Sequence, residues 1–139
     1  MDLQLAGKRV LVTGGSKGIR LAVAKAFLEE GAKVAINSSN PDNLTSANAT
    51  LYSKCLSLLV SIEDPESIDS FFGEIEDAWG GLDILINNAA MMIRSPLMEI
   101  SVDQWNKVLN TNLRGAFLCA QHAAKMMMKQ GEGVIINTS

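Results

Sequence analysis

Five short apolar runs recur along the chain, and a longer, more polar stretch separates each run from the next. The runs are rich in valine, isoleucine and leucine and too short for helices, so they predict β-strands. These predicted strands are residues 9–13, 33–37, 56–60, 83–87 and 134–138. Apolar residues at helical spacing predict helices between the strands. These predicted helices are residues 19–30, 41–50, 65–79 and 101–130.

Two of the predicted helices have residues typical of helix starts. Asp64 can cap the helix that begins with Pro65, and Ser101 with Gln104 matches the capping-box pattern. Helical spacing on the longest helix produces one apolar stripe, and we expect that face to be buried. The stripe contains Trp105, Val108, Leu109, Leu113, Ala116, Phe117 and Ala120.

The alternation of strands and helices predicts an α/β fold with a doubly wound parallel sheet. Continuous apolar strands indicate that helices cover both faces, and right-handed crossovers restrict the topology. We expect the Rossmann-type order 3-2-1-4-5, with the sheet stopping after the fifth strand. A length of 139 residues predicts a single domain, residues 1–139. Ligands of such sheets bind at the carboxyl ends of the strands.

Composition and charge exclude several classes of function. Hydrophobic residues make up 47% of the chain and charged residues 19%, which is typical of a globular protein. A net charge of −3 argues against nucleic acid as a partner, and no apolar run approaches the ~20 residues that span a membrane. The first residues do not resemble a secretory signal, so we expect a cytoplasmic protein. Cys55 and Cys119 have no metal-ligand spacing, so we expect no metal site.

A glycine-rich turn follows the first predicted strand directly, with Gly14 and Gly18 in a G-x-x-x-G spacing. Alone, such a turn is weak evidence, because glycines also form purely structural turns. At the carboxyl end of a first α/β strand, however, glycines let a diphosphate approach the backbone and the next helix's free N–H groups. The position therefore predicts a nucleotide phosphate site.

Asparagines supply two further candidate positions. Asn87 and Asn88 follow the fourth predicted strand, where their amides can bind a ligand or simply form a turn. Asn112 lies among the apolar residues of the longest helix, where a buried amide needs hydrogen-bond partners. A structural hydrogen bond between helix and sheet is the alternative to a catalytic role for Asn112.

Four ordered motifs together resemble the short-chain dehydrogenase/reductase family, in particular its 3-oxoacyl-carrier-protein-reductase-like members. The motifs are Thr13-Gly14-Gly15-Ser16-Lys17-Gly18-Ile19, Asn87-Asn88-Ala89-Ala90, Asn110-Thr111-Asn112-Leu113-Arg114-Gly115 and Gly133-Val134-Ile135-Ile136-Asn137-Thr138-Ser139. The resemblance implies NAD(P)-dependent hydride transfer between an alcohol and a ketone, with a small carbonyl or alcohol substrate. It implies that Thr13 braces the Asn-Asn-Ala segment and that Asn112 is the catalytic asparagine. The implied cofactor-binding residues are Gly14, Ser16, Lys17, Gly18, Ile19, Asn88, Ala89 and Ala90.

The end of the second predicted strand favours NADP over NAD, although NAD stays open. Ser38 and Ser39 stand there without the acidic residue that would bind the adenosine ribose and repel a 2′-phosphate. Lys17 offers a cation for that phosphate. Ser61 and Ile62 occupy the positions that border the adenine in the family.

The family's catalytic tyrosine and lysine are missing from the sequence, so the resemblance implies that the domain of residues 1–139 is incomplete at its C-terminal end. Tyr52 is the only tyrosine, and the residue four positions later is not a lysine. Ser139 is a candidate for the catalytic serine, displaced by one residue from the family's register. Three interpretations stay open: a fragment of an active enzyme, an inactive truncated product, or a separate nucleotide-binding module. The resemblance also implies a homo-oligomer that assembles through the longest helix.

Arg20 departs from the family, which places a third glycine at this position of the loop. An arginine can add a favourable charge beside the cofactor phosphates. It can equally fill space that the cofactor needs, because a close-packed turn accommodates extra volume poorly. The volume argument favours weaker cofactor binding.

Overall fold

The computed structural model describes residues 1–15, 18–52 and 54–139. It contains one five-stranded sheet whose strands are all parallel and run in the order β3-β2-β1-β4-β5, which confirms the predicted topology. The strands are β1 (Arg9–Val12), β2 (Lys33–Ser38), β3 (Leu56–Leu59), β4 (Ile84–Asn87) and β5 (Val134–Asn137). Each lies within one or two residues of its predicted bounds.

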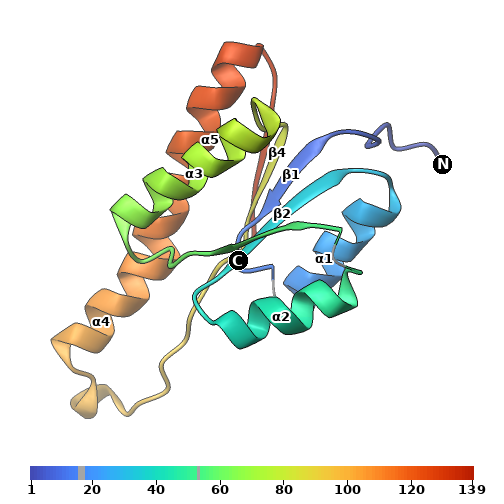
Figure 1. Cartoon of the computed structure of the whole chain (residues 1–139). Coiled ribbons are helices and arrows are strands. Elements are labelled where there is room, and N and C mark those ends of the chain that lie inside the picture. Colours follow the sequence, from blue (N-terminus) through green and yellow to red (C-terminus); the bar gives the residue numbers. More distant parts are fainter. Residues whose placement is uncertain (16–17, 53) are drawn as a thin grey trace.

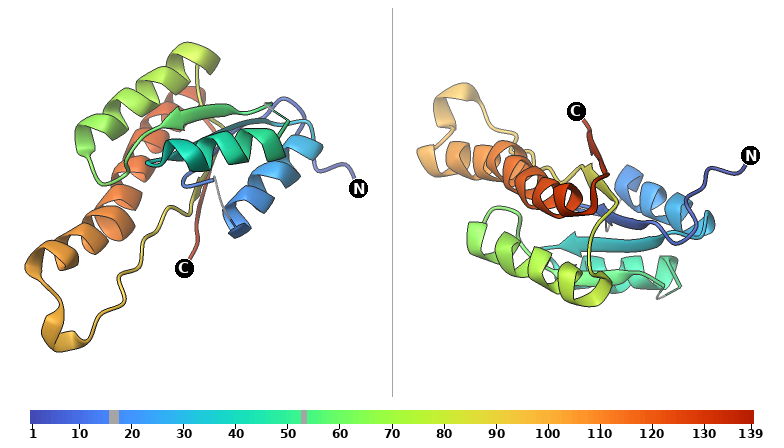
Figure 2. Two further views of the ribbon diagram at one scale, coloured as in Figure 1. Left: turned by 60° about the horizontal axis from the view of Figure 1, so that its bottom comes forward. Right: turned by 90° about the horizontal axis from the view of Figure 1, so that it is seen from above.

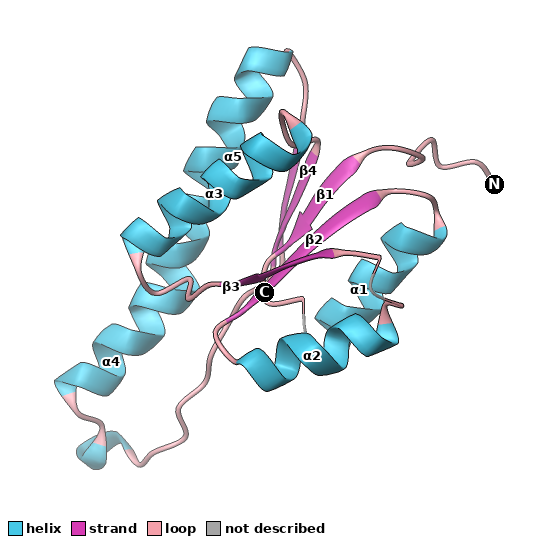
Figure 3. Ribbon diagram, viewed as in Figure 1, coloured by secondary structure: helices cyan, strands magenta, loops and turns pink. Residues whose placement is uncertain are grey.

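Helices cover both faces of the sheet (Figure 1, Figure 2). The helical elements are α1 (Gly18–Glu29), α2 (Pro41–Thr50), α3 (Pro65–Trp79), η1 (Leu97–Glu99), α4 (Val102–Leu109), η2 (Asn110–Gly115) and α5 (Ala116–Gln130). Helices α1 and α2 pack on one face, whereas α3 and α5 pack on the other. The loop after β4 runs away from the sheet to η1 and α4 (Figure 3). None of the helices in the described part of the chain is long and apolar enough to cross a membrane.

The sheet separates two apolar clusters. In β1, Val10 and Val12 face the cluster with α1 and α2, whereas Leu11 faces the cluster with α3 and α5. All three residues are fully buried because β1 lies at the centre of the sheet, where helices cover both sides. The packing fixes the carboxyl ends of β1, β2 and β4 relative to one another, which is what a site at this edge requires.

The longest predicted helix is divided by a six-residue π-helical segment, η2, between α4 and α5. In this segment Gly115 lies against Ile62, and a Cβ on Gly115 would overlap with the Ile62 side chain. The wider π turn therefore lies where the helix packs closely against the segment after β3. The periodicity of apolar residues did not predict this π turn.

The expected burial of the apolar stripe on this helix is wrong. Trp105, Leu113 and Phe117 are 60%, 66% and 58% exposed, and Asn112 is also exposed. The cause is position, because α4 extends past the sheet and no other segment of the described chain covers this side (Figure 1). The stripe is therefore an exposed apolar face.

A polar network joins the opposite edge of the sheet, at the amino ends of β1 and β4. The Arg9 guanidinium donates to both carboxylate oxygens of Asp83 at 2.9 Å, and the Arg9 N–H donates to Asp83 Oδ2 at 2.8 Å. Arg9 also donates to the Trp79 carbonyl and to Gln130 Oε1, at the ends of α3 and α5. The hydrogen bonds from the Arg9 guanidinium to the Asp83 carboxylate hold the pKa of Asp83 below its ordinary value.

Candidate functional site

Glycines allow the chain to pass closely between neighbouring strands where β1 ends. Gly14 has a φ of +65°, and a Cβ there would lie 3.1 Å from the Ala89 Cα atom. A Cβ on Gly15 would lie 2.5 Å from the Ile36 Cγ2 atom. Close contacts therefore require glycine at both positions, and the backbone conformation also requires it at Gly14.

Asn37 fixes the start of the glycine loop. The Gly14 N–H donates to Asn37 Oδ1 at 2.9 Å, and Asn37 Nδ2 donates to the Val60 carbonyl at 3.2 Å. The Asn37 side chain thus links the ends of β1, β2 and β3. It is only 2% exposed, so these hydrogen bonds are buried. Sequence reasoning missed this residue, and the available signal was a polar side chain inside an otherwise apolar strand.

Thr13 connects the loop to the segment after β4, as the family resemblance implied. Its hydroxyl accepts hydrogen bonds from the N–H groups of Asn88 and Ala89, both at 3.0 Å. The same hydroxyl donates to the Ile86 carbonyl at 3.3 Å. A single buried oxygen therefore sets the spacing between the glycine loop and the Asn88–Ala90 segment.

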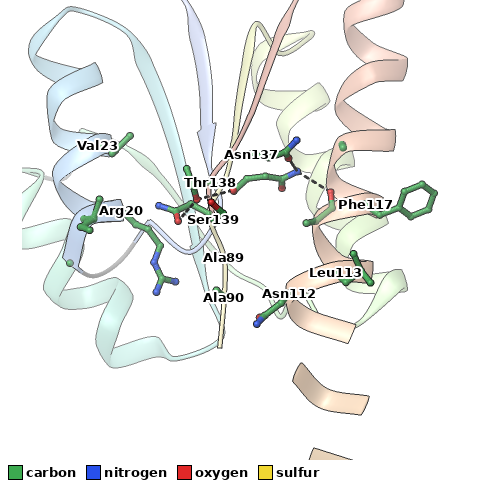
Figure 4. A pocket seen from close by; sticks show the side chains of 16 residues that line it. Arg20, Val23, Ala89, Ala90, Asn112, Leu113, Phe117, Asn137, Thr138 and Ser139 are labelled. Carbon is green, nitrogen blue, oxygen red and sulfur yellow. Dashed lines mark hydrogen bonds between the residues drawn. The ribbon is translucent and has the colours of Figure 1, made fainter. Parts of the chain in front are cut away.

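A cleft opens at this edge of the sheet as two neighbouring cavities of about 990 and 330 Å³. Arg20, Ala89 and Ala90 line both cavities and so mark their junction. Figure 4 shows these three residues in the lining of the larger cavity. Of the predicted site residues, the larger cavity is lined by Gly18, Ile19, Asn88, Asn112 and Ser139. The smaller is lined by Gly14, Ser38, Ser39, Ser61 and Ile62. Ser16 and Lys17, also predicted to bind the cofactor, lie outside the described residues.

Asn112 contacts the backbone of the loop after β4. Its Oδ1 accepts from the Met91 N–H at 2.8 Å, and its Nδ2 donates to the Met91 carbonyl at 2.9 Å. The amide thus clamps this loop to η2. The observed partner is the loop after β4 and not the sheet, so the hydrogen bond between helix and sheet that was the alternative to a catalytic role is not the contact found. The side chain still lines the larger cavity and enters from the side opposite Arg20 (Figure 4).

The ends of β4 and β5 are held by a second set of polar contacts. The buried Asn87 side chain donates to the Ala116 carbonyl at 2.9 Å and to Asn137 Oδ1 at 3.1 Å. The Thr138 hydroxyl donates to Asn88 Oδ1 at 2.6 Å, which orients the Asn88 side chain at the cavity wall. The neighbouring Ser139 lines the same cavity.

Charged side chains at the smaller cavity are few and of both signs. Arg20 and Lys107 supply positive charge, and Glu63 supplies negative charge. Ser38 Oγ accepts from the Asn40 N–H at 3.1 Å, and Ser61 Oγ accepts from the Glu63 N–H at 3.3 Å. Each serine hydroxyl therefore retains its proton for another acceptor. The Glu63 carboxylate was not among the predicted site residues.

The arrangement fits a dinucleotide better than a single small anion. The space next to Gly14 is one that a Cβ would fill. Helix α1 begins at Gly18, and its N-terminus lies at the larger cavity. A diphosphate at such a helix start would accept hydrogen bonds from the free backbone N–H groups. It would also be stabilised by the positive end of the helix dipole. The two cavities on either side of this position have room for two nucleoside moieties.

Comparison with known proteins agrees with this geometry. The model of the short chain dehydrogenase family matches residues 8–139. Gluconate 5-dehydrogenase of Gluconobacter oxydans is 36% identical over 136 residues, which cover 96% of this chain and 53% of that protein. A 3-oxoacyl-[acyl-carrier-protein] reductase of Vibrio cholerae is 34% identical and is matched over 97% of this chain and 55% of its own length.

Among solved structures, L-sorbose reductase of Gluconobacter frateurii, in complex with NADPH and L-sorbose, superposes with a TM-score of 0.91. The two sequences are 30% identical, and the match covers 99% of this chain and 54% of the reductase. The chain spans about half the length of the curated relatives it matches.

Proposed function

The chain belongs to the short-chain dehydrogenase family, and from this premise we propose that its cleft binds NADP(H) within an oxidoreductase that transfers hydride between an alcohol and a ketone. The observation that carries the proposal is the cleft itself. The glycine loop, the Thr13 brace and the start of α1 meet there between two cavities. The NADPH bound to the related L-sorbose reductase supports the choice of cofactor.

The adenosine half of the cofactor is proposed to occupy the smaller cavity. Ser38 and Ser39 would contact its ribose or 2′-phosphate, and Ser61 with Ile62 would border the adenine. No acidic residue lies at the end of β2, which supports NADP as the cofactor. Glu63 lines the same cavity, and a carboxylate there could bind the ribose of NAD, so NAD is the alternative.

The nicotinamide half is proposed to occupy the larger cavity, beside Asn88, Ala89 and Ala90. When bound, the cofactor supplies or accepts the hydride. Asn112 would keep the loop at Met91 in place beside the reacting groups, and Ser139 is a candidate to polarise a substrate carbonyl from the same wall. Which carbonyl or alcohol reacts is left open by this chain's residues.

We propose that the 139 residues bind the cofactor without turning over a substrate. Proton transfer in the family needs a tyrosine activated by a lysine, and the chain has one tyrosine, Tyr52. Tyr52 lies between α2 and β3, at the amino end of a parallel strand and therefore at the edge opposite the cleft. The proposal is compatible with a fragment of an active enzyme, an inactive truncated product and a separate nucleotide-binding module. We still expect the protein to be located in the cytoplasm.

A titration of the purified 139-residue chain with NADPH, followed by NADPH fluorescence, tests this proposal. We expect saturable binding with a dissociation constant between about 1 μM and 1 mM. In the same preparation we expect no ketone-dependent oxidation of NADPH. Absence of binding would overturn the cofactor assignment, and turnover that copurifies with the chain would overturn the proposed inactivity.

The exposed apolar face of α4, η2 and α5 is proposed to be an interface between two copies of the chain. Trp105, Leu109, Leu113 and Phe117 recur every four residues along it and are 38–66% exposed. Monomeric proteins rarely leave such a continuous apolar stripe in water. This interface is the one that the family resemblance implied.

Sedimentation velocity tests the proposed interface. We expect the native chain to sediment as a dimer or larger species and Trp105→Glu to shift it toward the monomer, because a charge would be buried at the contact. Met98→Glu is the matched control, since Met98 is 92% exposed in η1, away from the stripe. A native monomer, or an equal effect of both variants, would contradict this interface.

A further inference from the structure

Arg20 lies at the junction between the two cavities of the cleft. It is the third residue of α1, so its side chain projects from the helix start that faces the glycine loop. Its Nη1 atom is 2.8 Å from the position that a Cβ on Gly14 would take. Figure 4 shows the guanidinium reaching from α1 toward the segment that contains Ala89 and Ala90.

The guanidinium lies at this place without a charged partner among the described residues. The ion pairs found among the described residues do not include Arg20, nor do the hydrogen bonds found there. The same side chain lines the larger cavity with Asn88 and the smaller cavity with Ser38. It therefore occupies the space through which the two cavities would connect.

We infer that Arg20 is a gate that divides the cleft into two mononucleotide-sized halves and must swing aside before a dinucleotide can span them. The inference rests on the proposed function, because it concerns the path of the same cofactor. Moving a long side chain out of its packed position opposes binding of the whole dinucleotide. A ligand confined to one half of the cleft does not require this movement.

The opposite effect of Arg20 would be attraction between its guanidinium and the cofactor diphosphate. That contact needs the guanidinium at the side of the phosphates. The structure instead has its Nη1 next to Gly14 and in the wall that both cavities share, which is the path proposed for the diphosphate. The occupied volume therefore dominates over the added charge, as expected for a close-packed turn.

Calorimetric titrations of three variants against two probes test the gate. The probes are NADPH, which spans both halves, and adenosine 2′-monophosphate, which fits the smaller half. Arg20→Ala is expected to bind NADPH about 10-fold more tightly than the native chain. Arg20→Met keeps most of the side-chain volume without the charge and is expected to bind NADPH within about threefold of the native affinity. Arg20→Lys keeps the charge on a flexible stem and is also expected to bind no more tightly than native.

Because Arg20 also adds positive charge to the smaller half, the three variants are expected to bind adenosine 2′-monophosphate no more tightly than the native chain. Alanine favours helices, so Arg20→Ala keeps α1 intact. Weaker or unchanged NADPH binding by Arg20→Ala, with adenosine 2′-monophosphate still bound, would overturn the gate and leave the proposed function standing. If neither probe binds to any variant, the proposed function fails, and the gate fails with it.

Discussion

Replacing Gly14 by alanine is expected to weaken NADPH binding at least about 30-fold and to lower the free energy of unfolding by about 3 kcal/mol. Gly14 has a φ of +65°, which alanine adopts only with strain. The added Cβ would also lie 3.1 Å from the Ala89 Cα atom and 2.8 Å from Arg20 Nη1. Relief of these contacts must displace Ala89, a wall of both cavities.

Gly7→Ala is the matched control for this prediction. Gly7 has a φ of +74°, and no atom lies within 4 Å of the position of its Cβ. The control therefore has the backbone strain without the contact at the cleft. We expect its free energy of unfolding to fall by about 1 kcal/mol and its NADPH binding to stay normal. Urea denaturation and NADPH titration measure the two effects. Equal losses of binding in both variants would mean that Gly14 acts only through stability.

Replacing Asp83 by alanine is expected to lower the free energy of unfolding by about 3 kcal/mol, measured by urea denaturation. The substitution removes both hydrogen bonds to the Arg9 guanidinium and the acceptor of the Arg9 N–H. Arg9 has only 23% of its side chain exposed and would be left with neutral partners, the Trp79 carbonyl and Gln130. A partly buried charge without its counter-charge is costly.

Asp77→Ala, at an exposed position of α3, is the control and should change stability by less than about 0.5 kcal/mol. The pH dependence gives a second measurement. Because the pKa of Asp83 in the folded chain is below its ordinary value of 3.8, its contribution to stability is complete above about that pH. This contribution is lost as the pH falls through the lowered pKa. The free energy of unfolding of Asp83→Ala should therefore decrease less on acidification than that of the native chain. Identical acid profiles would contradict the role given to this pair.

The parts of the fold that local patterns determine could be predicted from the sequence. The Asp64 cap, the Ser101 and Gln104 capping box and the five strands all lie where the sequence placed them, within two residues. Each depends on neighbours in the chain: a side chain that reaches its own helix start, or a run of apolar residues. The glycine loop belongs to this class, because its position after the first strand determines its location in the fold.

The contacts that the sequence did not reveal join distant segments. Asn37 links the loop at Gly14 to the end of β3, and Arg9 meets Asp83 across 74 residues. Burial of the apolar stripe was predicted from its period, but whether anything covers a face depends on where α4 lies relative to the sheet. Local spacing carries no information on that position.

We propose that NADP(H) binds at the junction of the glycine loop, α1 and the Asn88–Ala90 segment. The most direct test is a titration of the isotope-labelled chain with NADPH, in which the backbone amide chemical shifts are measured. We expect saturable shifts of the amides of Gly14, Gly18, Ile19 and Ala89, and unchanged shifts of Gly7 and Trp105. No saturable shifts, or shifts confined to the exposed face of α4 and α5, would contradict it.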